Sequence, residues 1–379
     1  MREKSKRVDF LDGALVALAA GFLLIFGFGF LIFPQERFSE QENRALATWE
    51  MPSLSEILDG SFSERLGTVY RDQFPLRSGW ISLKAYGEIL LGKRENGGIL
   101  WGEDGMLMAR NTDYDRSVAE RNLSAVRRFR EEDPTRPVTA VWIPQSADVM
   151  TRYLPKDYPI DAASALYSDL EGEGVVPLRE LTEAAERGTQ VYYRTDHHLT
   201  TEGAYLVYCA LGERLGYLPR SLDFFSRQTV REHFLGSADS AIGGIAPRAD
   251  TVELFRYEGD GRVRVFEHTT GEVRDGFYDF DALEQKDQYE VFLGGNFAHL
   301  SITSGAESEK PTLLLIKDSF ANALIPFLAI HFDLEVLDLR YLSDETEVAD
   351  CDQTLILQGV HTLATDPSLA KLSFLKKKG

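Results

Sequence analysis

The sequence predicts an α/β fold preceded by a transmembrane helix. Two observations lead to this prediction. Short apolar runs that are typical of buried strands alternate with amphipathic helical patterns, most clearly over the last ~70 residues. An uninterrupted apolar run of twenty residues, 14–33, also has the length that a helix needs to cross the hydrocarbon core of a bilayer.

The composition is that of a folded, acidic protein. The chain has 379 residues, of which 44% are hydrophobic and 27% charged, and 41 basic against 60 acidic residues give a net charge of -19. Such a charge repels phosphate backbones and argues against a nucleic-acid partner. Cys209 and Cys351 are the only cysteines, too few for a disulfide framework or a four-cysteine zinc site. They are able to pair outside the cell, although Cys209 lies in an apolar helical pattern typical of a buried thiol.

The apolar run defines the N-terminal organisation. Basic residues precede it at positions 2, 4, 6 and 7, and Pro34 follows it, so the positive-inside rule predicts a cytoplasmic tail (1–10), an anchor (11–33) and an extracytoplasmic remainder. A cleaved signal peptide and a buried core helix are the alternatives. The run exceeds the usual ~7–15 residues of a signal peptide and lacks a small-x-small cleavage site, which favours a single-pass anchor in the cell membrane.

Residues 34–107 read as a helical lead-in to the main domain. A helix is expected to start at Ser53, and another is expected over 79–92, where apolar residues recur at helical spacing and Gly92 ends the pattern.

Residues 108–379 carry the α/β pattern. An amphipathic helix over 118–129 is followed by an apolar strand at 138–144. A short strand at 190–193 leads through a loop to a helix that Thr200 caps and Gly216 ends. A strand at 312–316, a helix over 321–332 and strands at 334–339 and 354–357 complete a parallel pattern. Between them, three β-like runs at 251–257, 262–268 and 273–278 predict a meander within a β-rich insertion, about 220–305, at one edge of the sheet.

Two short polar segments carry the candidate chemistry. Ser319 follows the apolar run at 312–316, at a strand-to-helix junction, where α/β folds expose a nucleophile next to helix amides. Asp196-His197-His198 occupies another loop before a helix, and a carboxylate there can orient an imidazole that takes the proton of a serine. Loops of this kind gather at one edge of an open sheet, so the two segments are expected to share a site.

Each of the two segments also has a purely structural interpretation. Asp318 or Ser319 can simply cap a helix, and the loop at 196–198 can be a solvated turn before the helix at Thr200. The aspartate and the two histidines are also good metal ligands, although no HExxH or similar second cluster accompanies them. No metal and no cofactor is therefore expected.

These segments resemble the signatures of the DHHW family, whose members are membrane-anchored extracytoplasmic bacterial proteins similar to SGNH hydrolases of the alginate O-acetylation branch. The most specific part is the stretch from Lys317 through Ser319 to Asn322. The other matching segments are 40–44, 72–77, 193–200, 203–205, 294–296, 326–328 and 338–341. The resemblance implies a three-layer α/β/α sandwich in permuted order, with the Asp/His segment before the serine.

Carried over residue by residue, the resemblance implies that Ser319 is the nucleophile, His198 the general base and Asp196 its orienting carboxylate, with His197 beside them. Leu199 stands where the family name has Trp, which removes an aromatic wall that could stack on a sugar. No obvious Asn follows the last strands to stabilise an oxyanion. The candidates for that role are the Ser319 backbone N–H and the side chains or loops of Asn322, Arg340, Tyr341 and Gln358.

The resemblance implies a membrane-anchored O-acyltransferase or esterase that acts on cell-envelope or extracellular polysaccharide, with a multi-pass membrane acyltransferase as a possible donor of the acyl group. The alternative is a non-catalytic envelope protein that binds glycan or a membrane partner through the same residues. The chain beyond residue 33 carries a net charge of -20, which repels anionic polymers. We therefore expect a neutral or amino-sugar polymer as the substrate.

Overall fold

The computed structural model describes residues 2–39, 41–42, 44–110, 114–156, 158, 164–304, 310–343 and 345–377. The chain forms two compact units. Unit 1 comprises Met1–Lys93 with Gly243–Ile245, and unit 2 comprises Arg94–Ile242 and Ala246–Gly379.

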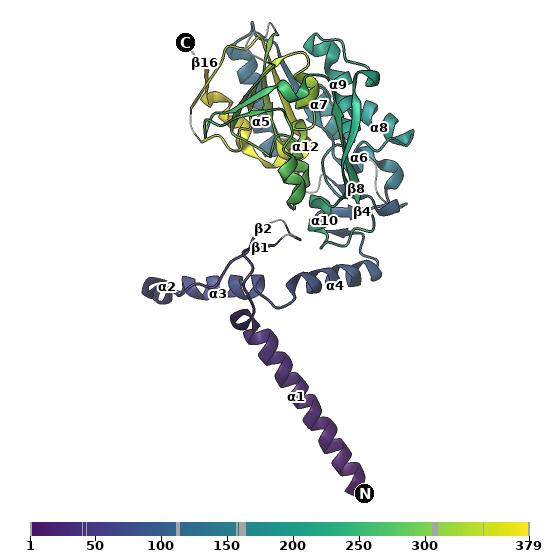
Figure 1. Ribbon diagram of the computed structural model, residues 1–379, viewed down its shortest axis with the longest axis vertical. Helices are drawn as coiled ribbons and strands as arrows, with labels where there is room; N and C mark the ends of the chain where they lie inside the picture. The colour runs from purple at the N-terminus through teal and green to yellow at the C-terminus, as the bar shows by residue number, and fades with distance from the viewer. Residues whose placement is uncertain are drawn as a thin grey trace. The chain divides into compact units, whose positions relative to one another are not determined.

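Unit 1 is mainly helical. Its elements are α1 (Arg2–Ile32), β1 (Phe38–Ser39), β2 (Arg44–Ala45), α2 (Leu54–Asp59), α3 (Ser61–Asp72) and α4 (Arg77–Leu90), which are purple to blue in Figure 1. Within α1, Asp12–Gly29 has a mean hydropathy of 1.9 and is only 6% buried, so the described residues hold one helix that is long and apolar enough to cross a membrane.

The predicted helix start at Ser53 is confirmed by local hydrogen bonds, and the helix expected over 79–92 is α4 (Arg77–Leu90). Ser53 caps α2 through a capping box, because its hydroxyl accepts the Glu56 N–H while the Glu56 carboxylate accepts the Ser53 N–H. The family-like segments at 40–44 and 72–77 also contact each other here, through an ion pair of 2.6 Å between Arg44 and Asp72. Residues 40 and 43 of the first segment lie outside the described residues.

Unit 2 is built around a mixed seven-stranded sheet of order β10-β9-β11-β13-β12-β15-β6. Its strands are β6 (Val138–Ile143), β9 (Arg264–Glu267), β10 (Val273–Asp275), β11 (His299–Thr303), β12 (Thr312–Lys317), β13 (Asp333–Leu337) and β15 (Gln353–Gly359). The pairs β13-β12, β12-β15 and β15-β6 are parallel, as the apolar runs of the sequence predict, and the pairs that involve β9, β10 and β11 are antiparallel.

Small sheets flank this one. They pair β3 (Glu95–Asn96), β4 (Ile99–Trp101) and β5 (Leu107–Ala109) with one another, β7 (Ser226–Phe234) with β8 (Asp250–Arg256), and β14 (Thr346–Val348) with β16 (Leu375–Lys377). The longer helices are α5 (Arg116–Glu132), α7 (Ser164–Glu171), α8 (Leu178–Glu186) and α9 (Thr201–Leu215), and the shorter ones are α6 (Ser146–Val149), α10 (Ser237–Ala241), α11 (Ile325–Leu328) and α12 (Val360–Thr365).

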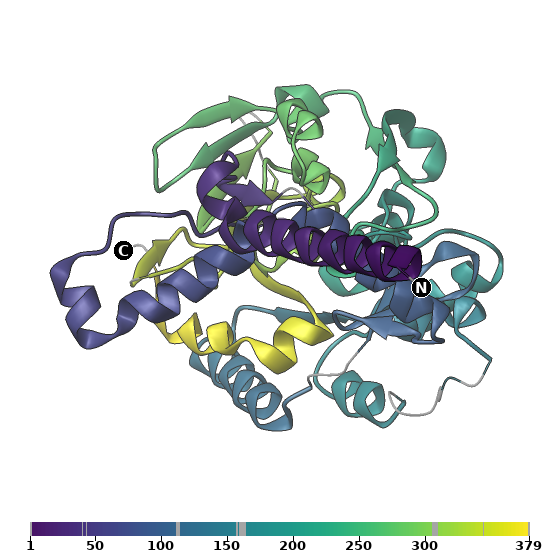
Figure 2. The ribbon, with the colours of Figure 1, turned by 90° about the horizontal axis from the view of Figure 1, so that it is seen from below.

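Side chains of the central strands alternate between two hydrophobic clusters, one on each face of the sheet. On β12, Leu313 and Leu315 join the cluster that packs on α8 and α9, whereas Leu314 and Ile316 join the cluster that packs on α5 and α12. The C-terminal 3₁₀-helix η9 (Pro367–Phe374) lies beside α5 in that second layer (Figures 1 and 2). Strands buried on both faces explain why these segments read as continuous apolar runs.

Three local expectations need correction. Residues 190–193 do not form a sheet strand, because they make only a bridge between Tyr192 and Leu199 across their own loop. The helix expected over 321–332 is shorter: a 3₁₀ turn η8 (Ser319–Ala321) precedes α11 (Ile325–Leu328), where Pro326 has no N–H to continue a regular ladder. The expected meander is divided, since β8 pairs with β7 while the β9–β10 hairpin extends the main sheet.

Candidate active site

Ser319 lies directly after β12, at the first residue of the turn η8. Asp318 caps that turn: its Oδ1 accepts the Phe320 N–H at 3.0 Å, and its Oδ2 accepts the Gly359 N–H at 2.8 Å and the Thr362 hydroxyl at 2.6 Å. These bonds join the end of β12 to the end of β15. The serine therefore stands on a turn that is fixed from two sides, with its own side chain partly exposed.

The loop that carries Asp196 and His198 is held by a buried carboxylate from another segment. Asp250 accepts the backbone N–H groups of Arg194 and Thr195 at 2.9 and 2.8 Å and the Thr195 hydroxyl at 2.7 Å. Because Asp250 is buried, desolvation raises its pKa, although these hydrogen bonds oppose the rise. The helix α9 then begins at Thr200, whose side chain accepts the Gly203 N–H as the sequence predicts.

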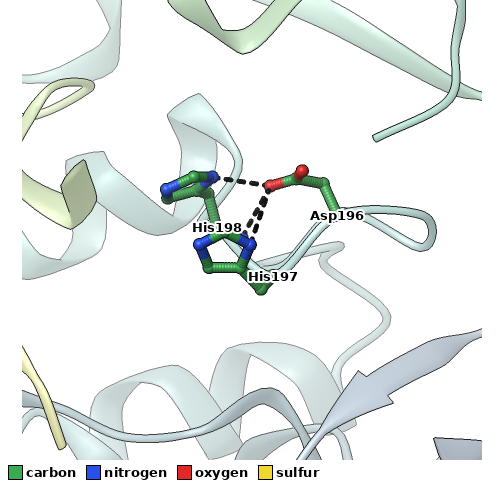
Figure 3. Close-up of side chains that lie close together, drawn as sticks. All are labelled: Asp196, His197 and His198. Atoms are coloured by element: carbon green, nitrogen blue, oxygen red, sulfur yellow. Dashed lines mark hydrogen bonds and ion pairs between the residues drawn. The ribbon is translucent and has the colours of Figure 1, made fainter. Parts of the chain in front are cut away.

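Asp196, His198 and Ser319, called the site triad below, are joined in a line of hydrogen bonds. His198 Nδ1 lies 2.6 Å from Asp196 Oδ1, and His198 Nε2 lies 2.8 Å from Ser319 Oγ. Figure 3 shows the aspartate and the imidazole facing each other within the loop. One imidazole thus connects a carboxylate to a hydroxyl, which is the geometry that general-base activation of a serine requires.

The Asp196 carboxylate is fully occupied. Its Oδ1 also accepts the His198 backbone N–H at 2.9 Å, and its Oδ2 accepts both the backbone N–H and the hydroxyl of Ser237 at 2.8 Å. Gly236 lies so close that a Cβ there would overlap the Asp196 side chain. Burial alone would raise the pKa of Asp196, but the adjacent His198 and His197 and these hydrogen bonds lower it well below its usual range. The carboxylate therefore stays ionised.

Aromatic rings fix the plane of the His198 imidazole. The ring of Tyr289 stacks on it at 3.8 Å with an interplanar angle of 1°, and Phe320 meets it edge-on at 5.4 Å. The Tyr289 hydroxyl also donates to the Ser319 carbonyl at 3.3 Å. Burial raises the pKa of Tyr289 well above its usual value, so the phenol remains a neutral donor. The stack stabilises a positive charge that develops on the imidazole.

His197 lies beside the triad rather than in it. Its Nδ1 lies 2.6 Å from the Ser237 hydroxyl and 3.9 Å from Asp196 Oδ1. Desolvation and the neighbouring His198 lower the pKa of His197, so its ring is neutral at pH 7 even though 37% of its side chain is exposed.

The other predicted residues do not hydrogen-bond to the triad side chains within the described part of the chain. Gln358 is buried on β15, and neither the oxygen nor the nitrogen of its side-chain amide has a hydrogen-bond partner among the described residues. Arg340 donates to both oxygens of Asp338, and Tyr341 is 55% exposed. Asn322 is buried, and its amide donates to the Gly295 carbonyl and to Asn296 Oδ1, both at 3.4 Å.

A polar network at the end of β12 joins three of the family-like segments. Lys317 is 1% exposed, donates to Asn296 Oδ1 at 2.8 Å and lies 3.8 Å from Asp338 Oδ2. Burial lowers the pKa of Lys317 to about 8, while the charge of Asp338 opposes this. Because the oxygen of Asn296 accepts from Lys317 and Asn322, its NH₂ group is left to donate elsewhere.

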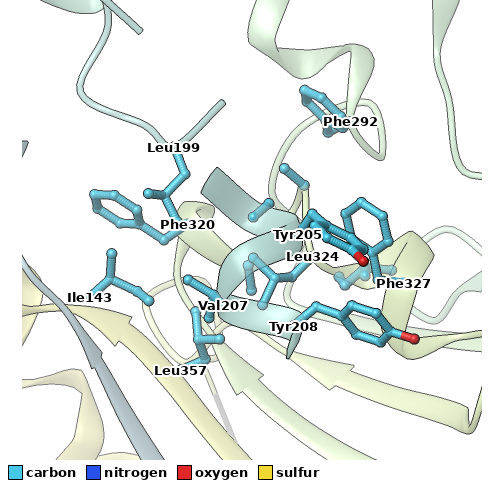
Figure 4. Close-up of a cluster of buried hydrophobic side chains, with 14 of the residues drawn as sticks. Ile143, Leu199, Tyr205, Val207, Tyr208, Phe292, Phe320, Leu324, Phe327 and Leu357 are labelled. Atoms are coloured by element: carbon cyan, nitrogen blue, oxygen red, sulfur yellow. The ribbon is translucent and has the colours of Figure 1, made fainter. Parts of the chain in front are cut away.

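Leu199 corrects an expectation. It is fully buried and belongs to the hydrophobic cluster with Ile143 and Phe320 (Figure 4), so this position faces the core and offers no wall for a sugar. Leucine in place of tryptophan is therefore a packing difference. The two cysteines are both free, with Cys209 half-buried and Cys351 buried.

Two groups of metal-ligand residues lie within reach of one ion among the described residues. One is Asp196, His197 and His198, in which Asp196 Oδ1 and His198 Nδ1 are already hydrogen-bonded to each other. The other is part of a set that we call the strand cluster: His268, His299, Ser301 and Glu335, on and next to β11 and β13. Its imidazoles stack in parallel at 3.6 Å, so no ion can lie in the plane of both rings. Both arrangements fit hydrogen bonding better than metal coordination.

Sequence reasoning missed several residues of the site. Ser237 and Gly236 support Asp196, Tyr289 stacks on His198, and Asn296 meets Lys317. Only Asn296 carried a sequence signal, because it lies in the family-like segment 294–296. The other three occupy the insertion, where no pattern marks them.

Comparison with known proteins supports the fold and gives a match to one family model. Residues 162–337 match the DHHW protein family model. A crystal structure of a DHHW family protein from Eubacterium siraeum has a TM-score of 0.60 and 19% identity, and the match covers 75% of this chain and 98% of that one. The structure of Bacillus cereus PatB1 with a sulfonyl adduct has a TM-score of 0.57 and 17% identity, and the match covers 73% of this chain and 100% of that one. The O-acetyltransferase domain of Pseudomonas putida AlgJ has a TM-score of 0.45 and 18% identity, and the match covers 73% of this chain and 98% of that domain.

No curated protein sequence matches the chain. Identities below 20% are evidence for the fold alone, and the mixed α/β architecture with a central mixed sheet agrees with it. The family model adds the sequence pattern, and it spans both the Asp/His loop and the serine turn. The resemblance seen in the sequence is therefore confirmed, because residues 162–337 match the DHHW protein family model.

Proposed function

We propose that the chain is a serine-dependent O-acyltransferase or esterase of extracytoplasmic polysaccharide, with an SGNH-like domain in permuted order. The observation that carries the proposal is the line of hydrogen bonds from Asp196 through His198 to Ser319.

In the proposed reaction, Ser319 Oγ attacks the acyl carbonyl while His198 Nε2 takes the hydroxyl proton. Asp196 holds the other nitrogen and stabilises the imidazolium that forms. The tetrahedral intermediate then expels the donor alcohol, which recovers the proton from His198, and leaves an acyl ester on Ser319. A sugar hydroxyl or water attacks that ester by the same steps in reverse, giving an O-acylated polysaccharide or free acid.

The oxyanion of each intermediate needs hydrogen-bond donors, and we propose Asn296 for this role, in place of Gln358. The orientation of the Asn296 amide supports this, because Lys317, two residues before the nucleophile, engages its oxygen. Asn296→Ala should lower turnover about 10²-fold, as removal of one such donor does, with a smaller effect on substrate binding. Gln358→Ala is the matched control.

The apolar segment of α1 supports a single-pass membrane anchor with the catalytic unit outside the cell. A signal peptide remains the alternative for this segment. Placement at the membrane would suit an acyl donor delivered by a multi-pass membrane acyltransferase, and the acidic chain favours a neutral or amino-sugar polymer as acceptor.

A direct test compares two serines of the same protein. The purified full-length chain should hydrolyse p-nitrophenyl acetate and be labelled by a fluorophosphonate or a sulfonyl fluoride, and Ser319→Ala should do neither. Ser301→Ala, which removes the hydroxyl of the strand cluster, should keep both properties. Equal activity in Ser319→Ala would refute the proposal and leave the non-catalytic alternative, a glycan-binding envelope protein.

A further inference from the structure

The helix α4 has an outward face that consists of large apolar side chains. Leu76, which caps the helix, and Trp80, Leu83, Tyr86 and Leu90 recur at spacings of three or four residues, and Leu83 and Leu90 are 60% and 87% exposed. At 100° per residue these side chains, with Gly79, Gly87 and Leu91, occupy an arc of ~140° that contains no charged residue. A contiguous exposed apolar stripe of this kind marks a surface that is covered in the functional state.

The opposite face of α4 is already occupied. Ile81 and Ala85 lie against Gly243, where a Cβ would stand 3.1 and 3.3 Å from their side chains, and the Ser82 hydroxyl donates to the Gly243 carbonyl at 2.8 Å. These contacts fix the rotation of the helix within unit 1. The apolar stripe therefore cannot turn inward.

The stripe begins where the apolar segment of α1 ends. Phe26 stacks on Phe74 at 5.4 Å and meets Trp80 edge-on at 5.9 Å, and the Tyr70 hydroxyl donates to the Phe26 carbonyl at 3.1 Å. Gly29, four residues before the end of the apolar run at residue 33, is covered by Pro75 so closely that a Cβ would overlap the proline ring. The start of α4 thus lies beside the last two turns of the apolar run, near the end at which α1 leaves the hydrocarbon core.

The local charge suits a lipid surface. Residues 74–93 carry Arg77, Lys84 and Lys93 against Glu88, whereas the chain as a whole carries -19. Lys84 is 70% exposed at the border of the stripe. Tryptophan and tyrosine within the stripe are the residues that prefer the interface between lipid and water.

We propose that α4 is an interfacial helix that lies in the outer surface of the same bilayer that α1 crosses, with its Leu76–Leu90 stripe among the lipid headgroups and upper acyl chains. The proposal rests on the anchoring role of α1 in the proposed function. Its chemistry is that of other interfacial helices, in which buried apolar area and flanking basic residues together favour the membrane surface.

The test uses the full-length chain, with Cys209 and Cys351 replaced by serine, in nanodiscs of phosphatidylcholine and phosphatidylglycerol. An NBD fluorophore is attached at Leu83→Cys, at Ser78→Cys on the opposite side of the same helix, or at Leu18→Cys within α1. Dibrominated phosphatidylcholine should quench NBD at position 83 at least about twofold more than at position 78, because only the stripe contacts acyl chains. Aqueous iodide should show the reverse preference.

The outcomes separate the proposal from its premise. Quenching at position 18 without quenching at position 83 refutes the interfacial helix and leaves the anchor intact. Protection of position 83 from iodide without quenching by brominated lipid also refutes it, and assigns the stripe to a protein, such as a second copy of this chain. Absence of quenching at position 18 refutes the anchor, and the interfacial helix with it.

Discussion

The site triad and the strand cluster contain the same chemical groups in different connections. Each has a serine hydroxyl, imidazole and a carboxylate, and the distances are nearly equal. The serine–imidazole distance is 2.8 Å in the triad and 2.7 Å in the strand cluster, and the imidazole–carboxylate distance is 2.6 Å and 2.7 Å. A parallel ring stack accompanies each: Tyr289 lies on His198 of the triad at 3.8 Å, and His268 lies on His299 in the strand cluster at 3.6 Å.

In the triad a single imidazole, that of His198, bonds both the carboxylate and the serine hydroxyl. In the strand cluster, His268 contacts Ser301 while His299 contacts Glu335, and Ser301 also donates directly to Glu335 at 2.9 Å. A proton taken from Ser301 would pass to His268, whereas the carboxylate of Glu335 is hydrogen-bonded to His299 and to Ser301 itself, and the ring stacked beside His268 is a second base rather than an electron-rich phenol. Residue composition and contact distance are therefore alike in the two clusters, and the order of connection is what distinguishes the proposed catalytic serine, Ser319, from Ser301.

The largest expected effect separates the two clusters by their imidazoles. His198→Ala should lower kcat/KM for p-nitrophenyl acetate on the order of 10⁶-fold, because the proposed nucleophile loses its base. His268→Ala, an exposed position next to a serine at the same distance, should leave the rate within about twofold. A comparable loss in both variants would mean that the connection order has no catalytic meaning.

The carboxylates should differ in the same way, with a somewhat smaller effect. Asp196→Asn keeps the shape but favours the wrong tautomer of His198, so kcat should fall on the order of 10⁴-fold. Because each oxygen of Asp196 accepts two hydrogen bonds, the asparagine NH₂ group must face donors, and the melting temperature should fall as well. Glu335→Gln should instead leave kcat unchanged and lower only the melting temperature. Retained activity in Asp196→Asn would exclude an orienting role for this residue.

The sequence predicted the strands and the triad for identifiable reasons. The run at 312–316 and its neighbours are buried on both faces, so they read as continuous apolar segments, and the two polar motifs follow or precede such elements. The three residues of the site triad were chosen through the family resemblance, because the aspartate and histidine lie two residues apart and the serine stands in the most specific matching stretch. Their catalytic roles stay a prediction.

What the sequence could not provide is long-range register. Ser237 reaches Asp196 from a position 41 residues away, at the first residue of the short helix α10, which no periodic signal marks. Ser301 faces Glu335 only because these two residues are partners in the β11–β13 ladder, and a shift of one residue would turn one of them to the other face. Tyr289 likewise reaches His198 from the short helix η7 (Gln288–Val291), which no periodic signal marks.

The buried lysine at the end of β12 gives the triad region a distinctive response to pH. The folded pKa of Lys317 is about 8, whereas an unfolded lysine titrates near 10.4. Between these values the unfolded state binds more protons, so the free energy of unfolding rises with pH by up to about 3 kcal/mol from this group alone.

Lys317→Met removes that contribution. The stability difference between wild type and the variant, measured by denaturant unfolding at pH 7 and pH 10, should therefore shift in favour of wild type on going to pH 10. The same pair of measurements on Glu335→Gln serves as the control from the strand cluster. A pH-independent difference for Lys317→Met would show that the amine is not buried in its charged form.

Close backbone packing should matter at the triad carboxylate. Gly236→Ala places a methyl group against Asp196, which cannot move because four hydrogen bonds hold it, so stability should fall by about 2 kcal/mol and kcat at least about tenfold. Gly261→Ala is the matched control, because a Cβ there meets nothing within 4 Å and its φ is not positive. Thermal unfolding and ester hydrolysis measure the two effects. Equal behaviour of the two variants would contradict the tight packing of the loop.

The smallest expected effect concerns the ring stacks. The transition state places a positive charge on His198, and the face of Tyr289 stabilises that charge, which is worth about 0.5–1 kcal/mol and corresponds to roughly two- to fivefold in rate. Tyr289→Leu should therefore lower kcat by that factor while KM changes little. Tyr289→Phe retains the stacked ring and loses only the weak bond from its hydroxyl to the Ser319 carbonyl at 3.3 Å, so it should recover most of the rate. If Tyr289→Phe and Tyr289→Leu lower kcat equally, the hydroxyl of Tyr289 and not its ring supports the reaction. The parallel stack would then have no more effect on catalysis in the triad than it has in the strand cluster.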